Sequence, residues 1–155
     1  SLGHGLPIAT GMAFAKKKRG EKGKVFVLIS DGECQEGTTW ESLLIASKHK
    51  LNNLIVIVDY NKIQALQRIE DVLPLNSLSK KFKSFNWNCN EIKDGHSFLL
   101  LKKYLNKVDK NKPSVFIVNT IKGKGIKSFE NDPVWHAKKL GNKEIIIGKR
   151  ALGIK

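Results

Sequence analysis

Residues 25–37 have the sequence VFVLISDGECQEG, and this stretch carries the strongest structural pattern in the chain. Residues 25–29 are all apolar, and an unbroken apolar run of this length is typical of a strand buried on both faces of a parallel sheet. Polar residues and glycine follow at once, and over residues 36–49 the apolar residues recur with helical spacing. The stretch therefore predicts a buried strand that leads through a polar turn into an amphipathic helix.

The same apolar run with a polar end recurs further along the chain. Residues 54–58 form a second run, which ends in the polar residues 59–61, and residues 115–118 form a third. Helical spacing over residues 5–18 predicts a helix before the first strand. The other expected elements are a loop over residues 62–74, a short helix over 75–85, a weak strand near 88–92 and a helix from 94 to about 108.

This alternation of strands and helices indicates the α/β class. We expect three layers, α/β/α, around a mainly parallel sheet whose strands are joined by right-handed crossovers. The 155 residues suit a single domain over residues 1–155. Within it, residues 122–155 are rich in glycine and lysine and are expected to be largely irregular.

Composition excludes several classes of protein. Hydrophobic residues make up 41% of the chain, which excludes wholesale disorder, and no apolar run approaches the roughly 20 residues of a membrane helix. Residues 1–10 lack the basic flank and apolar run of a signal peptide. Two cysteines, Cys34 and Cys89, are too few for a disulfide scaffold and fit a reducing compartment, so we expect a cytoplasmic protein.

The formal net charge of +14 raises the alternative of a basic nucleic-acid-binding module. Of the 28 basic residues, however, only Arg19, Arg68 and Arg150 are arginine, the residue that binds phosphates and bases through two parallel hydrogen bonds. The lysines are scattered along the chain. A solvated basic surface is therefore the preferred interpretation, with no nucleic-acid partner.

Polar residues end each predicted strand, and the carboxyl ends of parallel strands meet at one edge of a sheet, where ligands bind. Residues 30–33, 59–63 and 120–125 should therefore converge. Asp31 and Asn61 can offer oxygens to one hard cation such as Mg²⁺, and Gly32 leaves room for a phosphate. Each residue alone also fits a plain capping or turn role.

The spacing between Asp31-Gly32 and Asn61, thirty residues later, resembles the thiamine diphosphate signature of the transketolase family. Further segments resemble family motifs in the same order, over about residues 1–136. These segments are residues 1–6 with 11–13, 31–37, 59–63, 120–125 and 135–136. The resemblance is closest to the amino-terminal, diphosphate-binding half that forms a separate subunit in split transketolase-like enzymes, and it implies a thiamine-diphosphate-binding fold.

The resemblance implies a role for each matching residue. The implied ligands of Mg²⁺ (or Ca²⁺) are Asp31, the side chain of Asn61 and the backbone carbonyl of Ile63. The implied thiamine diphosphate contacts are Leu2, Gly3, His4, Gly32, Glu33, Asn61, Ile63 and Ile121. The implied catalytic residues are Glu36, at a subunit interface, and His136, near the diphosphate and the substrate entrance.

The activity implied by the resemblance is transfer of a two-carbon ketol unit between sugars or sugar phosphates. The family's catalytic glutamate belongs to a pyrimidine-binding partner domain or subunit, so the chain is expected to be inactive alone and to act in a homodimer or heterotetramer.

The chain departs from the family pattern at three places, of which Ser30 and the missing start keep a second interpretation open. Ser30 stands where the signature usually has glycine, His4 stands where glutamine is common, and the chain starts inside the family pattern, incomplete at its N-terminus. A non-catalytic or decayed member of the fold is therefore the alternative. The intact Asp31, Glu36 and Asn61 favour the enzyme component.

Overall fold

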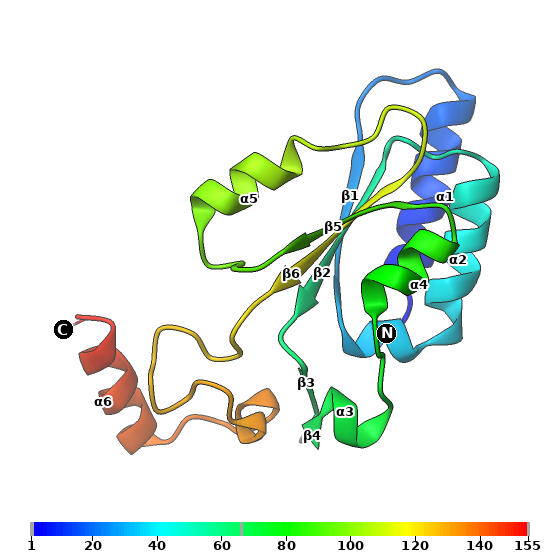
Figure 1. Ribbon diagram of the computed structural model, residues 1–155. Coiled ribbons are helices and arrows are strands. Elements are labelled where there is room, and N and C mark those ends of the chain that lie inside the picture. The colour runs from blue at the N-terminus through cyan, green and yellow to red at the C-terminus, as the bar shows by residue number, and fades with distance from the viewer. Residues whose placement is uncertain (1, 66, 155) are drawn as a thin grey trace.

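The computed structural model describes residues 2–65 and 67–154, so Ser1, Leu66 and Lys155 lie outside the described residues. Within them, a four-stranded parallel sheet with the order β1-β2-β6-β5 forms the centre of the fold (Figure 1). The strands are β1 (Val25–Ser30), β2 (Leu54–Tyr60), β5 (Asn88–Ile92) and β6 (Ser114–Asn119). The three apolar runs and the weak strand of the sequence are thereby confirmed as neighbours in one sheet.

Helices cover both faces of this sheet. Three of them, α1 (Gly5–Lys18), α2 (Gly37–Lys48) and α4 (Leu78–Ser84), lie on one face, and α5 (Phe98–Leu105) lies on the other (Figure 1). The expected three-layer α/β/α arrangement is therefore confirmed.

Two helices are shorter than the sequence predicts. Helix α4 begins after Ser77, whose hydroxyl caps it by accepting a hydrogen bond from the Lys80 N–H at 3.4 Å. Helix α5 ends at Leu105 rather than near residue 108.

The core divides into two clusters because successive strand residues point to opposite faces of the sheet. Val56 and Val58 of β2 pack toward α1 and α2, whereas Ile55 of β2 and Phe116 of β6 pack toward α5. Trp87 anchors the first cluster: its ring is buried, and its Nε1–H donates to the carbonyl of Leu43 at 3.2 Å.

Strand β1 departs from the prediction of burial on both faces. Phe26 and Leu28, which point away from α1, are 57% and 69% exposed, while Val25 and Ile29 on the other side are buried. The reason is the position of β1 at the edge of the sheet: the second face carries only α5 among the described elements, and α5 packs near β5 and β6. For β1 the expectation of a two-sided burial is therefore wrong.

The loop expected over residues 62–74 contains short regular elements. These are the antiparallel strands β3 (Ile63–Gln64) and β4 (Gln67–Arg68) and the single helical turn α3 (Ile69–Val72). They hold the backbone that follows Asn61 close to the end of β2.

Residues 122–155 are irregular only in part. A 3₁₀ turn, η2 (Pro133–His136), and a ten-residue helix, α6 (Asn142–Ala151), interrupt this segment, with Glu144 accepting from the N–H of Gly141 at the helix start. In the part of the chain that the structure describes, no helix is long and apolar enough to cross a membrane.

Candidate functional site

The three polar strand ends converge at the carboxyl edge of the sheet, as the sequence predicts. They enclose a cavity of about 320 Å³ between the ends of β1 and β2, the β3–β4 hairpin and η2. Its lining residues are Leu2, Ser30, Asp31, Gly32, Asn61, Ile63, Gln64, Ala65, Lys122 and His136. The three predicted metal ligands, Asp31, Asn61 and Ile63, therefore line one cavity together with other predicted site residues, among them His136.

Asp31 is the side chain that ties the strand ends together. Its carboxylate is buried, with Oδ1 accepting from the Gly32 N–H at 2.9 Å and Oδ2 accepting from the Lys62 N–H at 2.6 Å. Lys62 has a left-handed backbone, φ 67°, which is uncommon for a residue with a side chain and persists only where surrounding contacts hold it. Asp31 thus fixes the turn that carries Asn61 and Ile63.

The charge of Asp31 lacks a compensating cation in the described chain. Burial, with a smaller contribution from the nearby Asp59 carboxylate, raises its pKa to about 6, although the backbone N–H groups of Lys62 and Gly32 act against this rise. Among residues 2–65 and 67–154, neither carboxylate forms an ion pair. Because an unpaired buried charge is costly, this site fits a bound cation.

The available donor atoms favour a hard cation. Asn61 Oδ1 lies at the same edge and accepts from the Ile63 N–H at 3.0 Å, so Asn61 and Ile63 are held next to one another. No group of three or more His, Cys, Asp or Glu that could hold a metal is present among the described side chains. One carboxylate, one amide oxygen and a backbone carbonyl, completed by phosphate oxygens, match the preference of Mg²⁺ for a few protein ligands and a phosphorylated partner.

Glycine at position 32 leaves space in the cavity wall. A Cβ built there would lie 3.1 Å from Oε1 of Gln64, so a larger residue would crowd the cavity wall. The missing side chain lets a phosphate group lie close to the backbone at the start of η1 (Gly32–Gln35), where residue 32 lines the cavity.

Ser30, the departure from the family pattern, has a local structural role. Its hydroxyl accepts from the Glu33 N–H at 3.2 Å, and Glu33 Oε2 accepts from the Ser30 N–H at 3.0 Å. This reciprocal pair stabilises the turn after β1 in the manner of a capping box. The Glu33 carboxylate is thereby engaged with Ser30, and Glu33 is not among the residues that line the cavity.

The other predicted site residues are only partly brought together. His4 is exposed, and its Nδ1 bonds with the carbonyl of Leu2 at 3.0 Å, so it does not line the cavity. Gly3 packs against Glu36 beside the start of α2, where the Thr38 hydroxyl donates to the Gly3 carbonyl at 2.7 Å.

Ile121 lines a second cavity, of about 520 Å³, on the face of the sheet that carries α5. The ends of β2 and β6 form one end of this cavity, and Asn61 and Lys122 line both cavities. The two cavities are therefore neighbours that share part of their walls.

Besides Ser30, three lining residues lie outside the predicted metal, cofactor and catalytic residues. Lys122 follows β6 at the same sheet edge. Its position just after a predicted strand is the feature of the sequence that could have indicated a place in the site. Gln64 and Ala65 enter through the β3–β4 hairpin. Nothing in the sequence separates them from an ordinary loop, because their placement depends on the hairpin.

These features define the class of the protein. Polar side chains lie beyond neighbouring strand ends of a parallel α/β sheet, which is the edge where proteins of this class bind their ligands. The chain belongs to the transketolase family: the family description "Transketolase, thiamine diphosphate binding domain" matches residues 1–155.

Relatives and solved structures agree with this assignment. The chain is 44% identical over 139 residues to one of the subunits of apulose-4-phosphate transketolase from Actinobacillus succinogenes, covering 89% of this chain and 50% of that protein. It is 35% identical over 142 residues to 6-deoxy-6-sulfo-D-fructose transketolase subunit SqwG of a Clostridium species, covering 90% and 51%. The chain thus spans about half the length of these curated relatives.

The fold is shared with a solved transketolase. The structure of transketolase from Campylobacter jejuni superposes with a TM-score of 0.91 over 99% of this chain and 25% of that chain, at 29% sequence identity. The α/β architecture derived from the sequence therefore agrees with that of an experimental family structure.

Proposed function

We propose that this chain supplies the Mg²⁺- and diphosphate-binding half of a transketolase-type enzyme. The observation that carries the proposal is the buried carboxylate of Asp31, which forms no ion pair with the described residues and lies in one cavity with Asn61 and Ile63. Asp31, the Asn61 amide oxygen and the Ile63 carbonyl would hold the metal. The open backbone at Gly32 and the Lys122 ammonium would receive the diphosphate.

Thiamine diphosphate, when bound, supplies the electron sink for cleaving a carbon–carbon bond and transferring a two-carbon ketol unit. This chain's residues anchor and orient the cofactor's diphosphate end. His136 is exposed at the rim of the cavity, where its imidazole can contact a substrate hydroxyl or a diphosphate oxygen. Glu36, at the start of α2 beside Gly3, is assigned to the contact between paired subunits.

Substrate and partner follow from the names of the relatives. Their names refer to apulose-4-phosphate and 6-deoxy-6-sulfo-D-fructose, which are sugars with an anionic group, and both names describe one subunit of an enzyme. We therefore assign this chain a sugar or sugar phosphate substrate and a separate pyrimidine-binding subunit, in a heterotetramer rather than a homodimer of longer chains. We assign the assembly to the cytoplasm, in agreement with two free cysteines, and expect the chain to be inactive without its partner.

The test of this proposal is a calorimetric titration of thiamine diphosphate into the assembled enzyme, with Mg²⁺ and with EDTA. The unaltered enzyme should bind only with Mg²⁺. Asp31→Ala should weaken binding by more than the about 10–100-fold typical of changes outside the metal's own ligands. Equal affinity of Asp31→Ala and the unaltered enzyme would refute the metal-site assignment.

A matched control is Asp109→Ala. Asp109 also accepts backbone N–H bonds, from Asn111 at 2.7 Å and Lys112 at 3.2 Å, but it precedes β6 and so lies at the opposite edge of the sheet. This variant should keep its cofactor affinity. Ketol transfer by the reconstituted complex separates the proposed enzyme from a decayed member of the fold, which would bind without turnover.

A further inference from the structure

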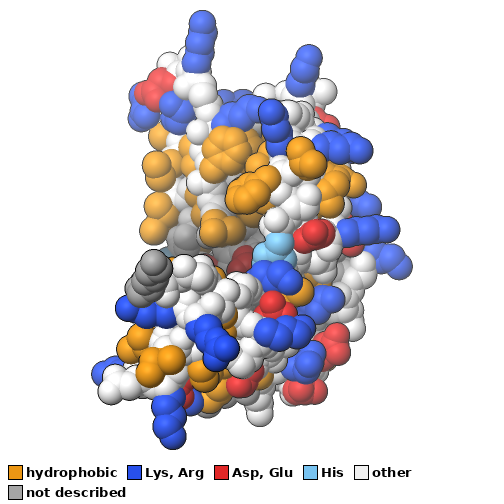
Figure 2. Space-filling model, turned by 90° about the vertical axis from the view of Figure 1, so that its left-hand side faces the viewer, with side chains coloured by type: hydrophobic (Ala, Val, Ile, Leu, Met, Phe, Trp, Pro, Cys, Tyr) orange, Lys and Arg blue, Asp and Glu red, His pale blue; other side chains and the backbone are white. Residues whose placement is uncertain are grey.

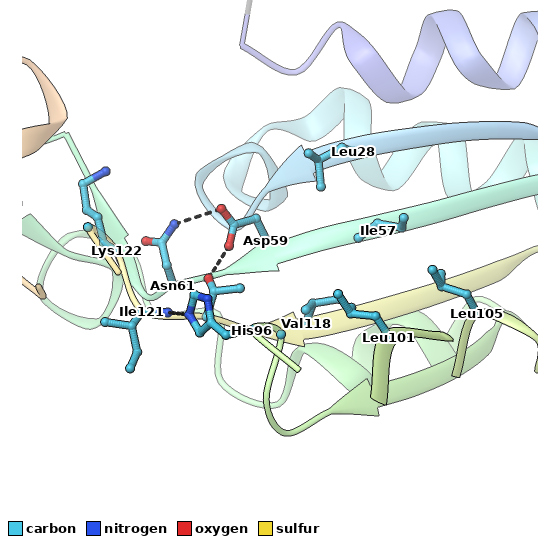
Figure 3. Close-up of a pocket in the computed structure, with 13 residues that line it drawn as sticks. Leu28, Ile57, Asp59, Asn61, His96, Leu101, Leu105, Val118, Ile121 and Lys122 are labelled. Atoms are coloured by element: carbon cyan, nitrogen blue, oxygen red, sulfur yellow. Dashed lines mark hydrogen bonds between the residues drawn. The ribbon is translucent and has the colours of Figure 1, made fainter. Parts of the chain in front are cut away.

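A second carboxylate, Asp59, lies next to the proposed metal ligand Asn61 at the end of β2. Its Oδ2 accepts from Asn61 Nδ2 at 3.5 Å, and its Oδ1 accepts a hydrogen bond from the hydroxyl of Thr120 (Figure 3). Asp59 is half-buried and, within the described chain, forms no ion pair. We propose that Asp59, itself held by Thr120, is a positioning residue that orients the Asn61 amide toward the cation. This inference rests on the proposed function.

The orientation of the Asn61 amide follows from the chemistry of its two neighbours. An ionised carboxylate can only accept hydrogen bonds, so the amide nitrogen must face Asp59. The Ile63 backbone N–H can only donate, so the amide oxygen must face Ile63, as the 3.0 Å bond records. A rotation of the amide by half a turn would place two acceptors together and two donors together. Both neighbours therefore select the rotamer that leaves the oxygen available as a metal ligand.

Thr120 is itself anchored independently of Asn61. Its backbone N–H donates to the Tyr60 carbonyl at 3.3 Å, which joins the end of β6 to the end of β2. The turn before α5 holds the next residue, because the Ile121 N–H donates to His96 Nε2 at 2.9 Å (Figure 3). The Thr120 hydroxyl is thus presented from a fixed backbone, and it fixes Asp59 in turn.

This arrangement predicts a distinctive set of mutational effects. Asp59→Ala leaves the Asn61 amide free to rotate, and loss of an outer-shell partner of this kind raises the Mg²⁺ Kd by about 10–100-fold. Asp59→Asn should restore most of the affinity. The Thr120 hydroxyl can reverse its role and accept from the new amide nitrogen, which leaves the new amide oxygen for Asn61.

The substitution Thr120→Val distinguishes a positioning role of Asp59 from a packing role. As a single variant it should change the Mg²⁺ Kd little, because Asp59 remains an acceptor for Asn61. In combination with Asp59→Asn, it removes the hydroxyl that could accept from the new amide nitrogen. The double variant should therefore bind Mg²⁺ at least about tenfold more weakly than either single variant, in the range of outer-shell changes. A purely structural role for Asp59 would give no such difference between the single and double variants.

The experiment is a calorimetric Mg²⁺ titration of the assembled enzyme at saturating thiamine diphosphate, with thermal melting of each metal-free variant beside it. Asp109→Ala is the control and should match the unaltered enzyme. Two outcomes would overturn the role of Asp59 while leaving the proposed function intact. One is a Mg²⁺ Kd for Asp59→Ala within threefold of the value for the unaltered enzyme. The other is a double variant that binds Mg²⁺ no more weakly than the two single variants do. Absence of Mg²⁺ binding by the unaltered enzyme would overturn the proposed function, and this inference with it.

Discussion

At the scale of single residues, Asp31 combines two functions that the sequence presents as alternatives. It is a cap, since it accepts from the Gly32 N–H, and it is also the buried carboxylate at the proposed cation site. The same burial that makes Asp31 costly without a cation makes it an effective ligand, because little water competes for its oxygens.

The raised pKa of Asp31 predicts how pH affects the metal-free chain. An acid whose pKa is higher when folded holds its proton in the folded state while the unfolded state has lost it. The Asp31 contribution to the free energy of unfolding therefore falls as pH rises from about 4 to about 6. The ¹³C resonance of the Asp31 carboxyl should titrate with a midpoint near pH 6.

The matched measurement is the pH dependence of unfolding by urea for Asp31→Asn. Glu21, Glu130 and Glu144 have lowered pKa values and act in the opposite sense, so only the difference between the two proteins isolates Asp31. The variant should lack the decline between pH 4 and 6. A carboxyl midpoint below pH 4.5 would show that Asp31 is not desolvated as the structure has it.

At the scale of elements, the turn between β5 and α5 locks onto the end of β6. The Gly95 N–H donates to the Asn119 carbonyl at 2.8 Å. A Cβ at this position would clash with Val118 and would lie 2.7 Å from a methyl carbon of Thr120 and 3.0 Å from the Asn119 oxygen. This contact places the residue that holds Asp59, so a local change here acts on the site.

Gly95→Ala should accordingly lower the free energy of unfolding by about 1–3 kcal/mol, the usual cost of overpacking. The control is Gly11→Ala in α1, where nothing lies within 4 Å and where alanine should add about 0.5–1 kcal/mol through helix propensity. Urea denaturation of both variants provides the comparison. Equal effects of the two substitutions would contradict the close packing at Gly95.

At the scale of the whole molecule, one face of the sheet is only partly covered. Phe26 and Leu28 are exposed beside the cavity that Ile57, Leu101 and Leu105 line. Figure 2, which views the molecule from the side of α5, shows hydrophobic side chains gathered above a hollow. An exposed apolar area of this kind is unusual for a surface that stays in water.

The 155-residue chain by itself should therefore bind the dye ANS in its folded state. Replacing Phe26 and Leu28 together by threonine should remove at least about half of that fluorescence, since threonine suits a strand but is polar. Ile146→Thr, on the exposed face of α6, is the control and should change it little. Full ANS fluorescence in the double variant would place the apolar surface elsewhere.

Much of the fold follows from local patterns. Residues 54–58 and 115–118 are continuous apolar runs, and their burial inside the sheet was predictable from that alone. The two-sided burial expected of residues 25–29 was not met, because burial depends on where a strand lies in the sheet, and an edge position leaves no mark in the run itself. The hairpin of β3 and β4 was missed because two-residue strands are too short to show a period.

The sequence by itself determined the class of fold, the residue types at the strand ends and the spacing of Asp31 and Asn61, because these depend on periodicity along the chain. Only the tertiary structure decided which of these residues meet. It placed Asp31, Ile63 and His136 around one cavity, turned Glu33 toward Ser30 and left His4 outside. It also revealed the link from Thr120 to Asp59, since contacts between residues 61 positions apart depend on strand order, which no local pattern records.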